Sequence, residues 1–143
     1  AIHNNPFLEL VGCHVRGADK AGKDAGVLAG IGPVGVIATS DVDALLALRP
    51  DCVSYNGLWA SPDDFCRILE RGINIVTTSA FVTGHALGEA ARNRILDACR
   101  RGNSSIFGSG IHPGFSSLIS LVAAGICDRI ENISLLESVD ATG

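Results

Sequence analysis

Apolar-rich runs alternate with helix-like segments along most of the chain. The runs over residues 8–15 and 36–38, and those over residues 52–55, 73–77 and 105–107, are predicted to be strands. In most of them apolar and polar residues do not alternate regularly, as they would in a sheet with one solvent-exposed face. Such continuous apolar runs are typical of strands that are buried on both faces. Strands that alternate with helices in this way predict an α/β fold built on a doubly wound parallel sheet.

The segments between these runs carry the start signals of helices. One helix is predicted to begin at Ser61, which would be its N-cap, with Pro62 at the first helical position. Another is predicted after Ser40 as N-cap, and two more over residues 87–101 and 116–126. The last of these is apolar on nearly all sides, so we expect it to be buried.

The C-terminal segment has a different pattern. Over residues 130–140 apolar and polar positions alternate with a period of two, as in a strand of a one-sided sheet. We therefore expect residues 1–128 to form one domain and residues 129–143 to hold the first strand of a second domain.

The strand and glycine-rich turn that usually open a dinucleotide-binding sheet are not found before Phe7. The expected fold is thus a Rossmann-type sheet that lacks its first strand and its glycine-rich turn. In the usual strand order the lacking strand would lie between residues 8–15 and 52–55. We expect the chain alone to bind a cofactor weakly and to be inactive.

Composition narrows the choice of partners. The chain has 143 residues, of which 47% are hydrophobic and 18% charged, with a net charge of −4. It has no basic stripe for nucleic acid, and its longest apolar stretch, residues 118–127, is too short to cross a membrane. The five cysteines are spread among aliphatic residues without metal-ligand spacing, so we expect no metal site and reduced thiols in a cytoplasmic protein.

Candidate chemistry lies in the turns that follow the strands, because ligands of open α/β sheets bind beyond the carboxyl ends of strands. Polar or glycine-bearing turns occupy residues 14–17, 55–57, 77–80 and 108–115. The last turn combines glycines with a proline, which predicts a rigid turn whose backbone approaches a flat ring closely. Its histidine, His112, can donate a hydrogen bond or a proton near neutral pH.

Three of these turns carry a family resemblance. Tyr55-Asn56-Gly57, Thr77-Thr78-Ser79 and the Gly-x-His-Pro-Gly-Phe turn that starts at Gly110 resemble the dihydrodipicolinate reductase-like oxidoreductases. The branch that includes 2,4-diaminopentanoate dehydrogenase is the most similar in appearance. The resemblance implies an NAD(P)-binding domain followed by a substrate and oligomerisation domain, hence a homo-oligomer. It also implies hydride transfer to or from a carbon–nitrogen double bond or a related amine.

The resemblance and the turns together assign expected roles. His112 is the catalytic candidate, with a structural hydrogen bond inside its turn as the alternative. Arg16 stands where an NAD-binding sheet would carry an acidic residue, and an arginine there favours the 2′-phosphate of NADP, with NAD also possible. The alternative is that Arg16 belongs to a solvated charged loop. The residues expected to bind the cofactor are His14, Arg16, Tyr55, Asn56, Gly57, Thr77, Thr78, Ser79, Gly110, Pro113, Gly114 and Phe115.

Plainer interpretations remain open for several of these residues. Tyr55 to Gly57 can form an ordinary turn between a strand and a helix, and Thr77 to Ser79 can merely cap the next helix. A second class of function is also open, in which the chain is a non-catalytic nucleotide-binding or sensor module. Binding of a nicotinamide cofactor followed by turnover would separate the enzyme from the sensor.

Overall fold

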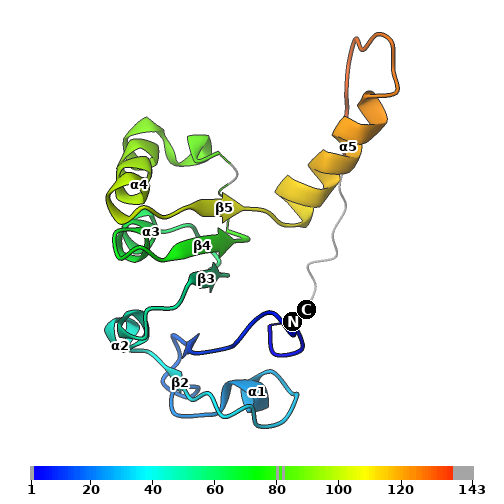
Figure 1. Ribbon diagram of the computed structural model, residues 1–143. Coiled ribbons are helices and arrows are strands. Elements are labelled where there is room, and N and C mark those ends of the chain that lie inside the picture. Colours follow the sequence, from blue (N-terminus) through cyan, green and yellow to red (C-terminus); the bar gives the residue numbers. More distant parts are fainter. Residues whose placement is uncertain (1, 80, 82, 137–143) are drawn as a thin grey trace. The chain divides into compact units, whose positions relative to one another are not determined.

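The computed structural model describes residues 2–79, 81 and 83–136, without the side chains of His112 and Pro113. It is a mixed α/β structure in which the strands pair in parallel (Figure 1). The chain divides into two compact units, Ala1–Asp51 and Cys52–Gly143. The expected domain boundary between residues 128 and 129 stays a prediction.

The first unit contains a two-stranded sheet and two short helices. Its elements are β1 (Cys13–His14), α1 (Ala25–Leu28), β2 (Ala38–Thr39) and α2 (Val42–Ala47). The strands predicted over residues 8–15 and 36–38 are therefore confirmed only in part, with two residues in each strand. A strand extends only as far as a neighbour pairs with it, and in the described structure β1 pairs with β2 alone.

One carboxylate organises the glycine-rich segment between β1 and β2. Asp24 caps α1 and accepts hydrogen bonds from the backbone N–H groups of Gly26, Val34 and Gly35, at 2.8, 2.9 and 2.7 Å. These bonds, that from Val34 first, hold the pKa of Asp24 below its usual value. A Cβ atom on Gly26 would lie 2.1 Å from the carbonyl oxygen of Gly32, so only glycine fits there.

The start of α2 differs from the prediction by one residue. Asp41, and not Ser40, is the N-cap, and its carboxylate accepts a hydrogen bond from the N–H of Ala44 at 3.0 Å. Aspartate caps a helix as well as serine does, so the side chain that meets the free N–H groups decides the position.

The second unit carries a three-stranded sheet. Its elements are β3 (Cys52–Tyr55), α3 (Pro62–Leu69), β4 (Asn74–Thr77), a 3₁₀ turn η1 (His85–Leu87), α4 (Glu89–Gly102), β5 (Ile106–Gly108), a π-helical turn η2 (Ile111–Phe115) and α5 (Ser116–Ala124). The strands lie in sequence order, β3-β4-β5. Strands predicted at residues 52–55, 73–77 and 105–107 are thus confirmed within one residue at either end.

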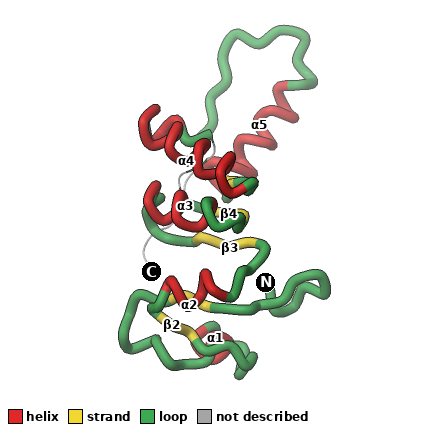
Figure 2. Tube along the Cα trace, turned by 60° about the vertical axis from the view of Figure 1, so that its left-hand side comes forward, coloured by secondary structure: helices red, strands yellow, loops and turns green. Residues whose placement is uncertain are grey.

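Two helices cover one face of this sheet, as Figures 1 and 2 show for α3 and α4. Ser61 caps α3 as predicted, and its hydroxyl accepts a hydrogen bond from the N–H of Asp64 at 3.2 Å. Side chains of α3, β4 and α4 form a buried core that includes Phe65, Leu69, Ile75 and Ile95. Burial of such side chains is the main source of the unit's stability.

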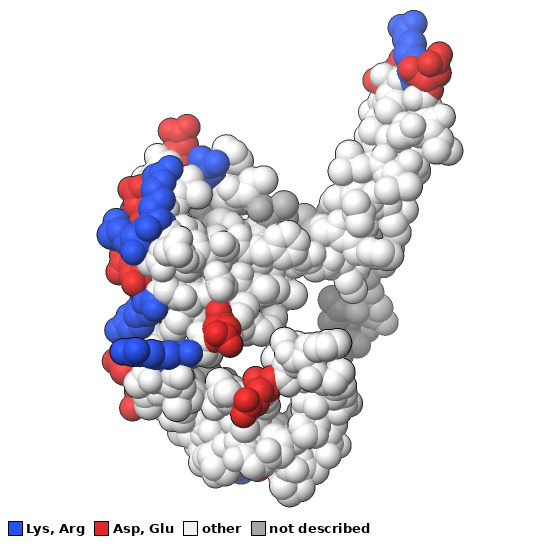
Figure 3. All heavy atoms as spheres, in the orientation of Figure 1, with Lys and Arg blue, Asp and Glu red and all other residues white. Residues whose placement is uncertain are grey.

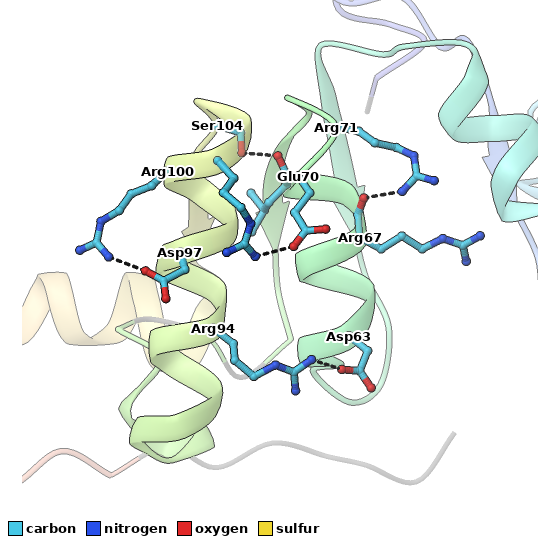
Figure 4. A network of polar contacts seen from close by, with 10 residues as sticks. Asp63, Arg67, Glu70, Arg71, Arg94, Asp97, Arg100 and Ser104 are labelled. Atoms are coloured by element: carbon cyan, nitrogen blue, oxygen red, sulfur yellow. Dashed lines mark hydrogen bonds and ion pairs between the residues drawn. The ribbon is translucent and has the colours of Figure 1, made fainter.

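The outer surfaces of α3 and α4 carry most of the charge of this unit (Figure 3). Asp63 pairs with Arg94 and Glu70 pairs with Arg101, each at 2.5 Å, so two ion pairs join the helices (Figure 4). All four side chains are exposed, between 44% and 82%. Ion pairs of that kind add little to stability, and we regard them as a solvated outer surface.

The end of α4 shows why the sequence has a glycine there. Gly102 belongs to the helix, and a Cβ atom on it would lie 1.8 Å from the carbonyl oxygen of Leu69 at the end of α3. The left-handed residue that ends the helix is Asn103, with φ 48°. Gly102 therefore allows the two helices to approach each other.

One prediction for the C-terminal part is wrong. The helix predicted over residues 116–126 forms as α5, but none of its residues is buried, because among the described elements it packs mainly against η2. The strand expected over residues 130–140 stays a prediction, because residues 130–136 form no strand in the described structure and residues 137–140 lie outside the described part. An apolar pattern predicts burial only where a partner surface is present.

Candidate functional site

The three strands of the second unit end side by side. The parallel register places Tyr55 next to Thr77, and Thr77 next to Gly108. The loops that follow these strands therefore leave the sheet at one edge, which we call the carboxyl edge. Ligands of open α/β sheets bind at such an edge.

The loop after β4 is held on the helix-covered side. Thr77 is 1% exposed, and its hydroxyl oxygen accepts a hydrogen bond from the N–H of Ser79 at 3.0 Å. Its carbonyl oxygen accepts another from the N–H of Ser109, also at 3.0 Å. The buried hydroxyl of Ser79 donates to the carbonyl oxygen of Gly57. The loops after the three strands are thus tied to one another.

Tyr55 also lies on the helix-covered side. Its hydroxyl donates a hydrogen bond to Asp64 of α3 at 3.1 Å, and its ring meets the edge of Phe65 at a centroid distance of 5.0 Å. Gly57 lies against the same ring, because a Cβ atom there would be 2.7 Å from Tyr55 Cε1. Tyr55 and Gly57 therefore support the loop after β3 from the helix-covered side. Their expected contact with a cofactor stays a prediction.

Asn56 and Thr78 are exposed, and they meet across the strands. The Thr78 hydroxyl donates to Asn56 Oδ1 at 3.2 Å, and Asn56 Nδ2 donates to the hydroxyl oxygen of Ser54 at 3.1 Å. Ser54 is missing from the residues expected from the sequence. The alternation of side chains along a strand could have found it, because Ser54 and Asn56 are two positions apart.

The Gly-x-His-Pro-Gly-Phe turn has a defined backbone. The N–H of Phe115 donates to the carbonyl oxygen of Gly110 at 2.9 Å, which makes a single π-helical turn, and Gly114 has φ 147°. The sequence predicted a rigid turn but not this form, which often occurs at functional sites. Pro113 contributes no N–H donor, which is the sequence signal for an interrupted α-helix.

The roles of the side chains in this turn stay predictions. Phe115 is 59% exposed, so its ring is open to a ligand. The side chains of His112 and Pro113 lie outside the described part of the structure. The catalytic role expected for His112 therefore stays a prediction. It rests on the position of η2, which follows β5 at the carboxyl edge.

His14 and Arg16 belong to the first unit. His14 is the last residue of β1, Arg16 follows two residues later, and both are exposed. Arg16 makes no ion pair with any residue that the structure describes. The expected contact of Arg16 with a 2′-phosphate stays a prediction.

The titratable groups of the helices do not suggest a second reactive centre. Burial raises the pKa of the Cys66 and Cys99 thiols, so these cysteines stay protonated and are poor nucleophiles. Within the described residues, no group of three or more His, Cys, Asp or Glu side chains is placed to hold a metal ion. None of the described helices combines the length and the apolar character needed to cross a membrane.

Comparisons with known proteins give one informative similarity. No family model matches the chain. The chain is 31% identical, over 149 aligned residues, to a protein of Streptomyces virginiae named amine dehydrogenase. The alignment covers 98% of this chain but 41% of that protein. The chain thus spans about two fifths of the length of the relative that it matches.

Proposed function

We propose that this chain is the cofactor-binding part of an NAD(P)-dependent oxidoreductase that acts on an amine or imine. The observation that carries the proposal is the similarity to an amine dehydrogenase along almost the whole chain. The parallel α/β architecture and the polar loops at the carboxyl edge support it, because nicotinamide cofactors bind at such edges. A dihydrodipicolinate reductase-like, Rossmann-type domain is the finer form of the proposal.

The proposed reaction is a reversible hydride transfer. In the oxidative direction the amine carbon loses a hydride and the amine nitrogen loses a proton, which leaves an imine. A bound nicotinamide cofactor would accept that hydride and return it in the reverse direction. The part of the protein is to orient the ring, to exclude water and to hold a proton near the nitrogen.

The chain offers groups for each of these tasks. The loops after β3 and β4, locked by the Ser79–Gly57 hydrogen bond, give a fixed edge against which a ring can be oriented. His112, in the turn after β5, is the proposed proton donor and acceptor. Arg16 is the proposed partner of a 2′-phosphate, and NADP is therefore the proposed cofactor, with NAD as the alternative.

The substrate site is proposed to depend on a further region. The relative is more than twice as long as this chain, since the alignment covers 41% of it. A full-length protein of that kind would have room for a substrate-binding and oligomerisation domain.

The test is cofactor binding followed by turnover in the full-length protein. Titration with NADPH and with NADH should show binding of at least one of them in the micromolar range. Addition of 2,4-diaminopentanoate, or of other small amines, to the protein with NADP⁺ should then raise the absorbance of the reduced nicotinamide. A protein that binds neither cofactor would contradict the proposal, and a protein that binds without any turnover over a broad amine panel would favour a sensor.

A further inference from the structure

Within the described part of the second unit, the face of the β3-β4-β5 sheet opposite α3 and α4 carries exposed residues, and we call it the open face. Side chains of the three strands alternate between the two faces, so Ser54, Val76 and Phe107 share the face that the helices leave free. The register joins them in one row across the sheet, Ser54 to Val76 to Phe107. Val76 is 45% exposed and Phe107 is 65% exposed, so the row presents apolar surface beside a hydroxyl.

A second row continues this face beyond the strand ends. Asn56 and Thr78 stand two positions after Ser54 and Val76, and their hydrogen bond keeps the same register. The open face thus consists of an apolar row with a polar row at the carboxyl edge. An aromatic ring with a polar substituent is complementary to this arrangement, because the ring would contact the apolar row and the substituent would contact the polar row.

The Asn56 amide has a fixed orientation. Its Oδ1 accepts from Thr78 at 3.2 Å, and its Nδ2 donates to Ser54 at 3.1 Å. A side-chain amide has two N–H donors and two acceptor lone pairs, so one donor and one acceptor remain. The side chain is exposed, and both remaining groups are available to a ligand.

One donor beside one acceptor is complementary to a primary carboxamide. We propose that the Asn56 amide, held between Ser54 and Thr78, recognises the carboxamide of the nicotinamide ring, while Val76 and Phe107 face the ring itself. This inference rests on the proposed function and adds to it the residue that determines specificity. Asn56 acts on binding and orientation of the ring and takes no part in proton transfer.

The test compares two ligands that differ only at the carboxamide. NADPH and its 3-acetylpyridine analogue are titrated into the full-length protein, and dissociation constants are measured by calorimetry. The acetyl group keeps the acceptor oxygen and lacks the N–H donor. The wild-type protein should bind NADPH about three- to tenfold more tightly than the analogue, as expected for one hydrogen bond.

Variants assign that preference to Asn56. Asn56→Ala should bind the two ligands with similar affinity, because NADPH loses two hydrogen bonds to Asn56 and the analogue loses only the one to its acetyl oxygen. Thr78→Val, which removes the hydroxyl that orients the amide, should reduce the preference as well. Asn93→Ala, an exposed asparagine on α4, is the matched control and should keep the wild-type preference. Melting temperatures show that each variant is folded.

The outcomes separate the inference from the proposed function. A wild-type protein that binds NADPH, combined with an Asn56→Ala variant that keeps the full preference, overturns the inference and leaves the proposed function intact. Equal weakening of both ligands in Asn56→Ala also overturns it. A wild-type protein that binds no nicotinamide cofactor overturns both.

Discussion

The two faces of the β3-β4-β5 sheet differ in the burial of their polar side chains and in the hydrogen bonds that these side chains make within the protein. On the helix-covered face, Tyr55, Thr77 and Ser79 have their polar atoms engaged by the protein itself. On the open face, Asn56 and Thr78 are hydrogen-bonded to each other and remain exposed. The same turns therefore supply both the support of the site and the groups that can meet a ligand. Neighbouring residues in one turn should respond to substitution in opposite ways.

The largest expected effect is a loss of stability on the covered face. Phe65 is fully buried, with ring contacts to Tyr55 and to Phe81 at 5.0 and 5.8 Å. Phe65→Ala should lower the free energy of unfolding by about 3–5 kcal/mol, because it leaves a cavity in the core. Urea unfolding of the full-length protein measures this. Phe107→Ala on the open face is the control and should change stability far less; an equal loss in both variants would contradict the difference between the faces.

The next effect is on catalysis. His112→Asn should lower kcat/KM by about a hundredfold, the typical contribution of an acid–base group, and should leave the melting temperature nearly unchanged. Steady-state kinetics and thermal unfolding of the same preparation measure the two quantities. If the variant loses mainly stability and keeps its activity per folded molecule, His112 is a structural residue of its turn.

A third effect concerns cofactor choice. If Arg16 binds the 2′-phosphate, Arg16→Ala should weaken NADPH binding by about 1.5–3 kcal/mol, as for other hydrogen bonds to charged groups. NADH lacks that phosphate, so its affinity should barely change. Calorimetric titration with both cofactors measures the difference, and an equal loss for the two would show that Arg16 is not the phosphate partner.

Much of this organisation could be predicted from local patterns. Ser61 and Pro62 marked the start of α3, and the apolar runs marked β3, β4 and β5, because caps and short buried strands depend on nearby residues. The sequence also predicted polar turns after β3 and β4. The structure joins these two turns by the hydrogen bond between Thr78 and Asn56.

The remaining features depend on partners that a local pattern does not contain. The apolar residues of α5 predicted burial, but burial needs a second surface. The strand expected over residues 8–15 is two residues long, and in the described part of the chain it pairs with β2 alone. The contact between Gly102 and Leu69 joins segments that are far apart in the sequence. The orientation of Asn56 depends on the hydroxyl of Ser54 in β3 and on that of Thr78, which follows β4.

The smallest effect contrasts neighbouring residues of one loop. Ser79→Ala leaves the carbonyl oxygen of Gly57 without the hydroxyl that it accepts from, so stability should fall by about 1–2 kcal/mol. Thr78→Ala removes an exposed hydroxyl and should leave stability within about 0.5 kcal/mol of wild type. Thermal and urea unfolding measure both, and the reverse order would show that the faces are assigned wrongly.

The central claim is that a nicotinamide cofactor binds at the carboxyl edge on the open face. Hydrogen exchange of the full-length protein, measured by mass spectrometry with and without saturating NADPH, tests it most directly. The account predicts slower exchange in peptides that contain residues 56–58, 78–79 and 110–115, and unchanged exchange in the exposed turns of α3 and α4. Cofactor binding with no change in the peptides of the carboxyl edge, or with protection confined to the helices, would contradict it.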